Sequence, residues 1–109
     1  MTRSNKDYYE EGRAGVELGL FYPLGDHISE TLGASVYEPT VPSDNAVLAL
    51  VQAVTENIRY TLDGTDPEAA VGFVITAGRD PILLPLSSNT TLKFIRETDG
   101  SILQLQFGE

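Results

Sequence analysis

The sequence predicts an all-β protein, a small antiparallel β-sandwich or barrel of about six strands with an extended N-terminal arm. From residue 43 onward, short apolar runs recur with turn residues between them, at about the 8–12-residue spacing of sandwiches and barrels. Several of these runs alternate apolar and polar residues, the period of a strand with one buried face. Residues 1–42 are instead interrupted repeatedly by glycine and proline. We therefore predict an arm over residues 1–42 and a β domain over residues 43–109.

The clearest strand pair lies between residues 58 and 75. Ile58, Tyr60 and Leu62 alternate with Arg59 and Thr61, and Val71, Phe73 and Ile75 alternate in the same way. Asp63-Gly64 is a strong turn signal, and Pro67 lengthens the connection because it has no N–H to donate. The pattern predicts a strand, an acidic loop of about eight residues, and a second strand.

The other strands are predicted from shorter signals. Residues 46–54 are apolar on both faces; composition alone also allows a helix, but the valines and the position before the hairpin favour a buried strand. Pro85 would interrupt a central ladder, so residues 81–86 are expected at a sheet edge. Residues 91–96 and 102–107 complete the set, the last with Leu103, Leu105 and Phe107 facing inward.

The predicted arm allows two interpretations. It packs back on its own domain, or it extends and binds a partner through clustered aromatic and aliphatic side chains, which bring large contact area at low rotamer cost. We favour the second, because so long a segment without regular structure is unusual inside a compact domain. Short helical turns are expected over residues 5–13 and 27–32. The predicted partner-binding residues are Tyr8, Tyr9, Leu18, Leu20, Phe21 and Tyr22.

Composition restricts the function classes. The 109 residues suffice for one small domain, and a formal charge of −9 offers no basic stripe for nucleic acid or for an anionic membrane. No cysteine is present, which removes disulfides and thiolate chemistry. The charged first residues lack the apolar core of a signal peptide, and no apolar run is long enough to span a bilayer. We therefore expect a soluble protein made in the cytoplasm.

No catalytic constellation is apparent. His27 is the only histidine, and Ser29 is too close in sequence to form a triad with it. Asp63, Asp66 and Glu68 form an acidic loop whose order does not match a calcium-binding loop, so turn chemistry explains it better than a metal. Asp63 is expected to supply the turn, and Asp66 a local side-chain hydrogen bond ahead of Pro67. We predict no enzyme activity, no cofactor and no metal site.

Residues 58–67 have the sequence Ile-Arg-Tyr-Thr-Leu-Asp-Gly-Thr-Asp-Pro, which resembles a hairpin found in two groups of proteins. One is the chitobiase C-terminal-like β-sandwich module appended to glycoside hydrolases. The other is a set of small tailed-phage and prophage structural proteins, in which the hairpin is followed by segments similar to residues 72–78 and 94–96 here. The resemblance covers roughly residues 56–107 and implies a component of a virus particle.

The resemblance, the charge and the arm together predict a capsid decoration or cement protein on the outer surface of a phage head. The predicted partner is the major capsid protein, with residues 1–42 as a clamp. A homo-oligomer, a dimer or a trimer, is also expected, because a β domain this small sits near the stability threshold. Its predicted face consists of Leu48, Leu50 and Val54. The alternatives are a carbohydrate-binding or host-surface recognition module, disfavoured because Tyr60, Phe73, Phe94 and Phe107 are all assigned to the core, and a head–tail connector or tail component.

Overall fold

The computed structural model describes residues 21–109, which form seven strands and no helix. Each strand is short, and turns or loops connect them in chain order. The strands are β1 (Ile28–Thr31), β2 (Leu48–Val54), β3 (Ile58–Thr61), β4 (Phe73–Ile75), β5 (Ile82–Pro85), β6 (Lys93–Arg96) and β7 (Ile102–Gly108). No helix among these residues is long and apolar enough to cross a membrane.

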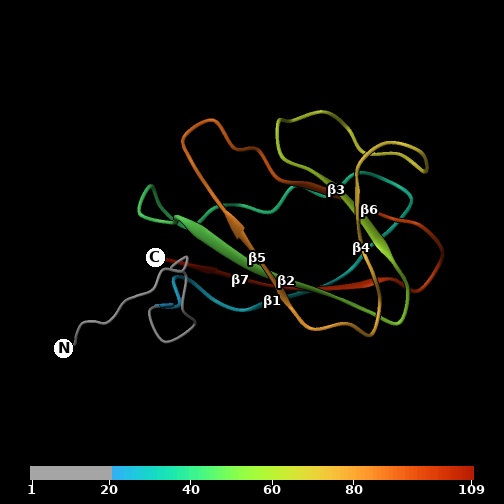
Figure 1. Cartoon of the computed structure of the whole chain (residues 1–109), viewed down its shortest axis with the longest axis horizontal. Helices are drawn as coiled ribbons and strands as arrows, with labels where there is room; N and C mark the ends of the chain where they lie inside the picture. Colours follow the sequence, from blue (N-terminus) through green and yellow to red (C-terminus); the bar gives the residue numbers. More distant parts are fainter. Residues whose placement is uncertain (1–20) are drawn as a thin grey trace.

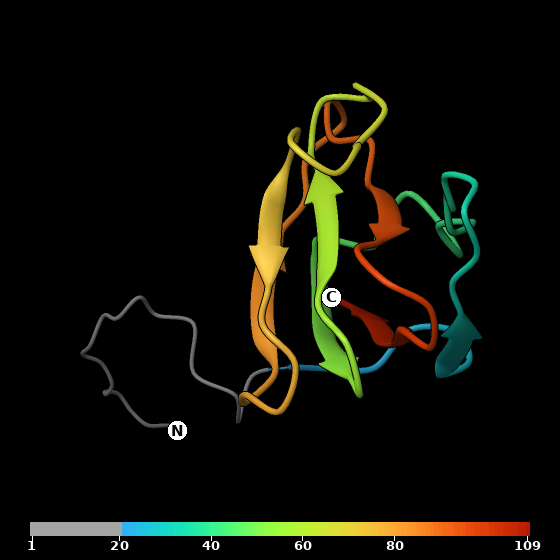
Figure 2. The ribbon, with the colours of Figure 1, turned by 90° about the vertical axis from the view of Figure 1, so that its right-hand side faces the viewer.

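The strands form two antiparallel sheets that pack as a β-sandwich. One sheet has the order β1-β7-β2-β5 and the other has the order β4-β3-β6 (Figure 1). In Figure 2 both sheets extend from left to right, with β4 and β5 at the left and β1 at the right. The all-β class and the sandwich predicted from the sequence are confirmed.

The core lies between the sheets and is built from alternate residues of each strand. Along β2 and β7 every second side chain is buried, as the pleat of a strand requires. Leu103, Leu105 and Phe107 face inward as predicted, and Phe94 of β6 is fully buried opposite them. The remaining members of the core are Leu32, Ala49, Val51, Ala53, Ile58, Tyr60, Ile75, Leu84 and Leu92.

One edge of the sandwich is closed by residues that the sequence assigned to the arm. β1 pairs with β7, and Leu32 continues this contact by donating its N–H to the carbonyl of Ser101 at 2.9 Å. Tyr37 then bridges to Phe94 of the other sheet through two backbone hydrogen bonds of 2.8 Å. Leu32 is buried in the core. The segment therefore crosses from one sheet to the other and covers the side of the core between them.

This arrangement corrects two expectations. The helical turn predicted over residues 27–32 is wrong, because Ile28–Thr31 is a strand whose hydrogen-bond partner is the otherwise free side of β7. The described part of the predicted arm, residues 21–42, contributes a strand and a core residue to the body, so a break at residue 42 does not separate it from the sandwich. The six strands predicted between residues 46 and 107 are all present, and Pro85 lies on an edge strand as expected.

Candidate interaction surface

The opposite edge of the sandwich is open. β4 is the outermost strand of its sheet and β5 is the outermost strand of the other, so each has one side without a strand partner among residues 21–109. Figure 2 places both strands at the left of the body. Apart from the connection between them, residues 76–81, no described segment crosses this edge as residues 32–37 cross the other.

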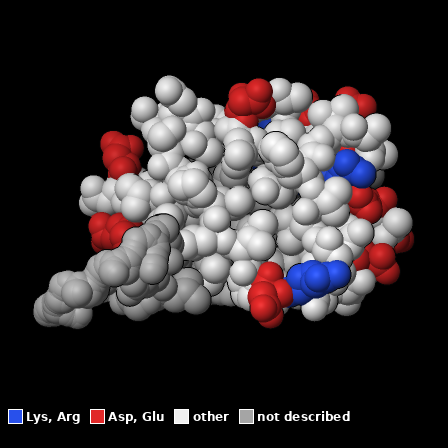
Figure 3. Space-filling model, viewed as in Figure 1, with Lys and Arg blue, Asp and Glu red and all other residues white. Residues whose placement is uncertain are grey.

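Exposed apolar side chains gather at this open edge. They are Leu62, Val71, Phe73, Val74 and Ile82. Figure 3, which views the molecule from this side, shows Asp, Glu, Lys and Arg around the margin and none in the middle. A surface that lacks charge, exposes several apolar side chains and has a charged rim is typical of a protein interaction site. We call the surface formed by these five residues the apolar edge.

Phe73 is the residue for which the core prediction was wrong. Tyr60, Phe94 and Phe107 are buried as predicted, whereas 62% of Phe73 is exposed. Its ring lies 5.6 Å from the ring of Tyr60, centroid to centroid, so it faces the core side of the sheet but lies at the rim of that core. β4 is an edge strand, and no described strand lies beyond it to cover the ring.

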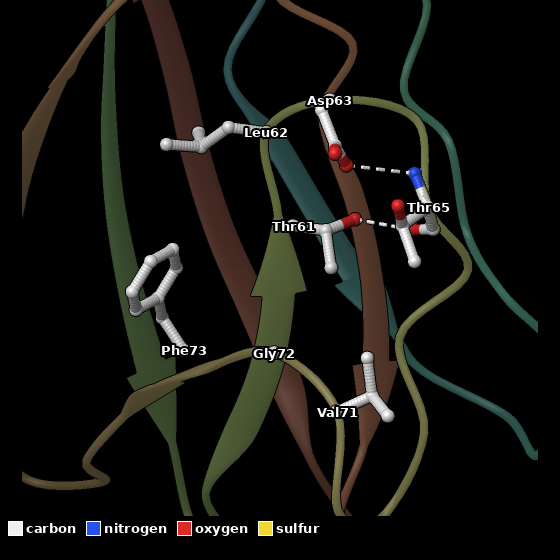
Figure 4. Close-up of a pocket in the computed structure, with 7 residues that line it drawn as sticks. All are labelled: Thr61, Leu62, Asp63, Thr65, Val71, Gly72 and Phe73. Atoms are coloured by element: carbon white, nitrogen blue, oxygen red, sulfur yellow. Dashed lines mark hydrogen bonds between the residues drawn. The ribbon is translucent and has the colours of Figure 1, made fainter.

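An open hollow of about 500 Å³ lies at the upper end of the apolar edge. Leu62 and Phe73 stand on one side of the end of β3, and Thr61, Asp63 and Thr65 stand on the other (Figure 4). These polar groups bind one another: the Thr61 hydroxyl donates to the Thr65 carbonyl, and the Thr65 N–H donates to Asp63 Oδ1 at 3.0 Å. The side of the hollow formed by Leu62 and Phe73 therefore suits an apolar side chain better than a sugar hydroxyl.

The acidic loop has a structural role. The hydrogen bond from Thr65 to Asp63 is the predicted turn bond, and Gly64 between them has a φ of 88°, which favours glycine. Asp66 forms an ion pair with Lys93 Nζ at 2.9 Å instead of the predicted local bond ahead of Pro67. Among residues 21–109, no three histidine, aspartate or glutamate side chains cluster as metal ligands.

The hydrogen bond from the Thr65 N–H to Asp63 predicts a lowered pKa for the Asp63 carboxyl, which NMR can measure. The backbone and hydroxyl donors of Thr65 lower the pKa of Asp63, because they stabilise its carboxylate. The stabilisation that this bond gives to the fold is therefore present above the unfolded pKa of about 3.9 and is lost as the pH falls through the lower folded value. We expect the carboxyl carbon of Asp63 to titrate below 3.9, and the Thr65 amide signal to shift with it. In the variant Thr65→Pro, which lacks the N–H donor, the pKa of Asp63 should return toward 3.9; an unchanged value would contradict the assignment.

Of the residues predicted to bind a partner, the structure describes Phe21 and Tyr22. Tyr8, Tyr9, Leu18 and Leu20 lie outside the described residues. Tyr22 is exposed, and its backbone pairs with Glu109 through bonds of 3.2 and 2.9 Å. The Phe21 ring lies over Gly108, where a Cβ would come within 2.5 Å of it. Phe21 therefore packs on the body of its own chain, and the absence of a side chain at position 108 makes room for it.

The predicted oligomer face is brought together on one side of β2. Leu48, Leu50 and Val54 are half-buried and alternate with the buried core residues of that strand. They share the outer side of the sheet with Gln52, and with Gln104 and Gln106 of β7. His27 Nε2 lies 2.6 Å from Gln104 Oε1, so this histidine takes part in a surface hydrogen bond. That these three residues bind another copy stays a prediction.

Comparison with known protein families gives one match. The family model described as Fn3 associated matches residues 48–103, just over half of the chain. The chain belongs to the Fn3-associated family. The matched span of this Fn3-associated domain begins with β2, includes β3 to β6 and ends within β7, whereas β1 and the segment before it lie outside. No curated protein and no solved structure matches the chain.

Proposed function

We propose that this Fn3-associated domain is a non-catalytic structural protein of a phage particle, which decorates or cements the outer surface of the head. The observation that carries the proposal is the apolar edge, a charge-free surface on a protein with a net charge of −9. Charged groups are depleted from the centre of protein interfaces, and apolar and aromatic groups are enriched there. Such a surface supports a role in binding another protein.

The virion context rests on the resemblance of residues 58–67, which form β3 and the start of the acidic loop. The negative charge supports a position on the outside of the head, because an acidic surface is repelled by packed DNA. The partner in this proposal is the major capsid protein. Residues 1–20 act as a tether, and a tether combined with a weak body contact gives longer residence than either contact alone.

Carbohydrate recognition is the weaker alternative. The exposure of Phe73 removes the original argument against it, because an aromatic side chain is available. The side chains of Thr61 and Asp63 beside the hollow are nevertheless turned away from Phe73 and bonded to the backbone of Thr65. A glycan would need such groups to fix its hydroxyls. The geometry therefore favours an apolar protein partner.

Particle binding tests the proposal. The double variant Tyr8→Ser/Tyr9→Ser should need at least about tenfold more protein to occupy purified particles of the virus that encodes the chain. Tyrosine is enriched among interface hot spots, whose truncation costs about 2 kcal/mol or more, and about 1.4 kcal/mol is a factor of ten. Occupancy is measured by co-sedimentation with the particles. The matched control is Val41→Ser, an exposed apolar residue of the described body, whose binding should equal the wild type. Equal occupancy by the double variant and the wild type would refute the tether, and no binding by the wild-type protein would refute the virion role.

A further inference from the structure

We propose that β4 binds residues 16–20 of a neighbouring copy of this chain, which add to the sheet β4-β3-β6 as a further strand. The inference goes beyond attachment to a particle, because it describes how copies of the protein join to one another. It rests on the free side of β4, on the apolar edge around it, and on the place where the described chain begins.

β4 is an unprotected strand edge. Natural proteins usually guard such edges with charged residues or proline, because the free N–H and C=O groups pair with any extended chain. β5 has this protection, since Pro81 and Pro85 flank it. β4 has the sequence Phe-Val-Ile, without charge or proline, and both Phe73 and Val74 are exposed. Successive residues of a strand point to opposite faces, so β4 presents apolar surface on both sides of its free edge.

The segment from Val16 to Leu20 has an apolar face that matches the Phe73 side of this edge. Val16, Leu18 and Leu20 alternate with Glu17 and Gly19, which gives an extended chain one apolar face and one polar face. It is the stretch of residues 1–20 in which apolar residues alternate in this way. Added beside β4, the apolar face would cover Phe73 and place one leucine in the hollow next to Leu62. Strand addition of this kind gains affinity from main-chain hydrogen bonds and specificity from alternate side chains.

The occupant comes from another copy because the segment cannot reach β4 of its own chain. Leu20 is bonded to Phe21, so their Cα atoms are about 3.8 Å apart. Phe21 lies over Gly108, and Pro23 pairs with Gly108 on the side of β7 that faces away from β2 and β5. From there the β5 edge is three strand spacings away, about 14 Å, and β4 lies in the other sheet, about 10 Å away in the perpendicular direction, so the two separations combine to roughly 17 Å. Residues 16–20 cannot lie along β4 of the same chain while Phe21–Leu24 keep their place on β7.

Such an exchange is head-to-tail, since the donor segment and the acceptor edge are different surfaces. Contacts of this type form a closed ring when a whole number of copies, each rotated by the same angle, completes a full rotation. Each copy carries a net charge of −9, so two copies repel each other. The apolar edge carries no charge, so contact at this surface keeps that repulsion low. In such a ring residues 16–20 and the apolar edge join the copies, and residues 1–15 of each copy remain as the tether to the capsid.

Chemical cross-linking tests the contact directly, because the natural chain has no cysteine. Purified full-length Glu17→Cys and Val74→Cys variants, whose side chains would share the polar face of the added strand, are mixed in equal amounts, one of them tagged, and treated with a short bismaleimide. We expect a covalent heterodimer. The matched control replaces Val74→Cys with Ser29→Cys, an exposed residue of β1 at the opposite side of the body, and should give none. Absence of the heterodimer with Val74→Cys, or equal yield with Ser29→Cys, overturns the proposal.

Sedimentation of the purified protein provides a second, independent measurement. Wild-type protein should associate at micromolar concentration. Val74→Glu, which would face Glu17 of the added strand, should weaken this association at least tenfold, while Ser29→Glu leaves it unchanged. A monomeric wild type, or an assembly that resists Val74→Glu but dissociates with Leu50→Glu, overturns the proposal; the latter result would place the interface on the outer side of β2 instead. Both experiments use no particles, so their failure is distinct from a failure of particle binding.

Discussion

Replacing Phe94 with alanine is expected to lower the free energy of unfolding by about 3–5 kcal/mol. Phe94 is fully buried between the two sheets, its ring lies 6.3 Å from that of Tyr60, and its backbone bonds to Tyr37. Removal of the ring leaves a cavity that the surrounding strands cannot fill. Since a small domain has only about 5–15 kcal/mol in total, the loss removes a large part of the stability. Urea denaturation followed by circular dichroism measures it.

Phe73→Ala is the matched control, because it removes the same ring from the other side of Tyr60. Phe73 is mostly exposed, so its loss should change the free energy of unfolding by less than about 1 kcal/mol. If Phe94→Ala does not fold, Phe94→Leu provides a smaller change of roughly 1.5 kcal/mol that can still be measured. Equal losses for the two alanine variants would contradict the placement of Phe73 at the rim.

Gly72→Ala should cost about 3 kcal/mol of stability, the second large effect expected. Gly72 has a φ of 121°, a region that L-residues other than glycine rarely adopt, and a Cβ there would lie 2.9 Å from the backbone oxygen of Tyr60. Backbone strain of this kind costs about 1–3 kcal/mol, and the contact adds to it because the clashing atom belongs to a paired strand. The same denaturation measurement applies.

Gly78→Ala measures the cost of backbone strain without the steric contact that Gly72→Ala adds. Gly78 also has a positive φ, 77°, but a Cβ there would have no neighbour within 4 Å. It should cost about 1–2 kcal/mol, the price of the left-handed conformation alone. If Gly72→Ala is no worse than Gly78→Ala, the close approach of β4 to β3 at Tyr60 is not rigid.

Most of the fold between residues 46 and 107 could be predicted because its signals are local. The alternation of Leu103, Leu105 and Phe107, or of Ile58 and Tyr60, follows from the pleat of a single strand. β1 could not be found in this way. Its four residues, Ile-Ser-Glu-Thr, carry one large apolar side chain, and they form a strand only because β7, more than seventy residues later, offers a free edge.

The interaction surface was harder to predict for a related reason. The pattern around Phe73 correctly gives a strand with Phe73 on its core-facing side, but alternation does not show where a strand stands in the sheet. β4 lies at the margin, where an inward-facing residue remains exposed. The turn bond of Asp63 was predictable from Asp-Gly alone, whereas the pairing of Asp66 with Lys93 depends on β6 and was not.

The pairing of Tyr22 and Leu24 with the C-terminal residues has a mechanical consequence. Tyr22 and Leu24 bond to Glu109 and Phe107, and a break at residues 25–27 separates this short ladder from the longer contact of β1 with β7. A force that pulls residue 21 sideways from the body would load these hydrogen bonds one after another, so they would break in sequence. A force along the strand would load them together in shear. Across residues 25–27 the side chains of Gln106 and Gln104 hold the segment, so peeling would break these bonds before it loads the longer ladder of β1 and β7.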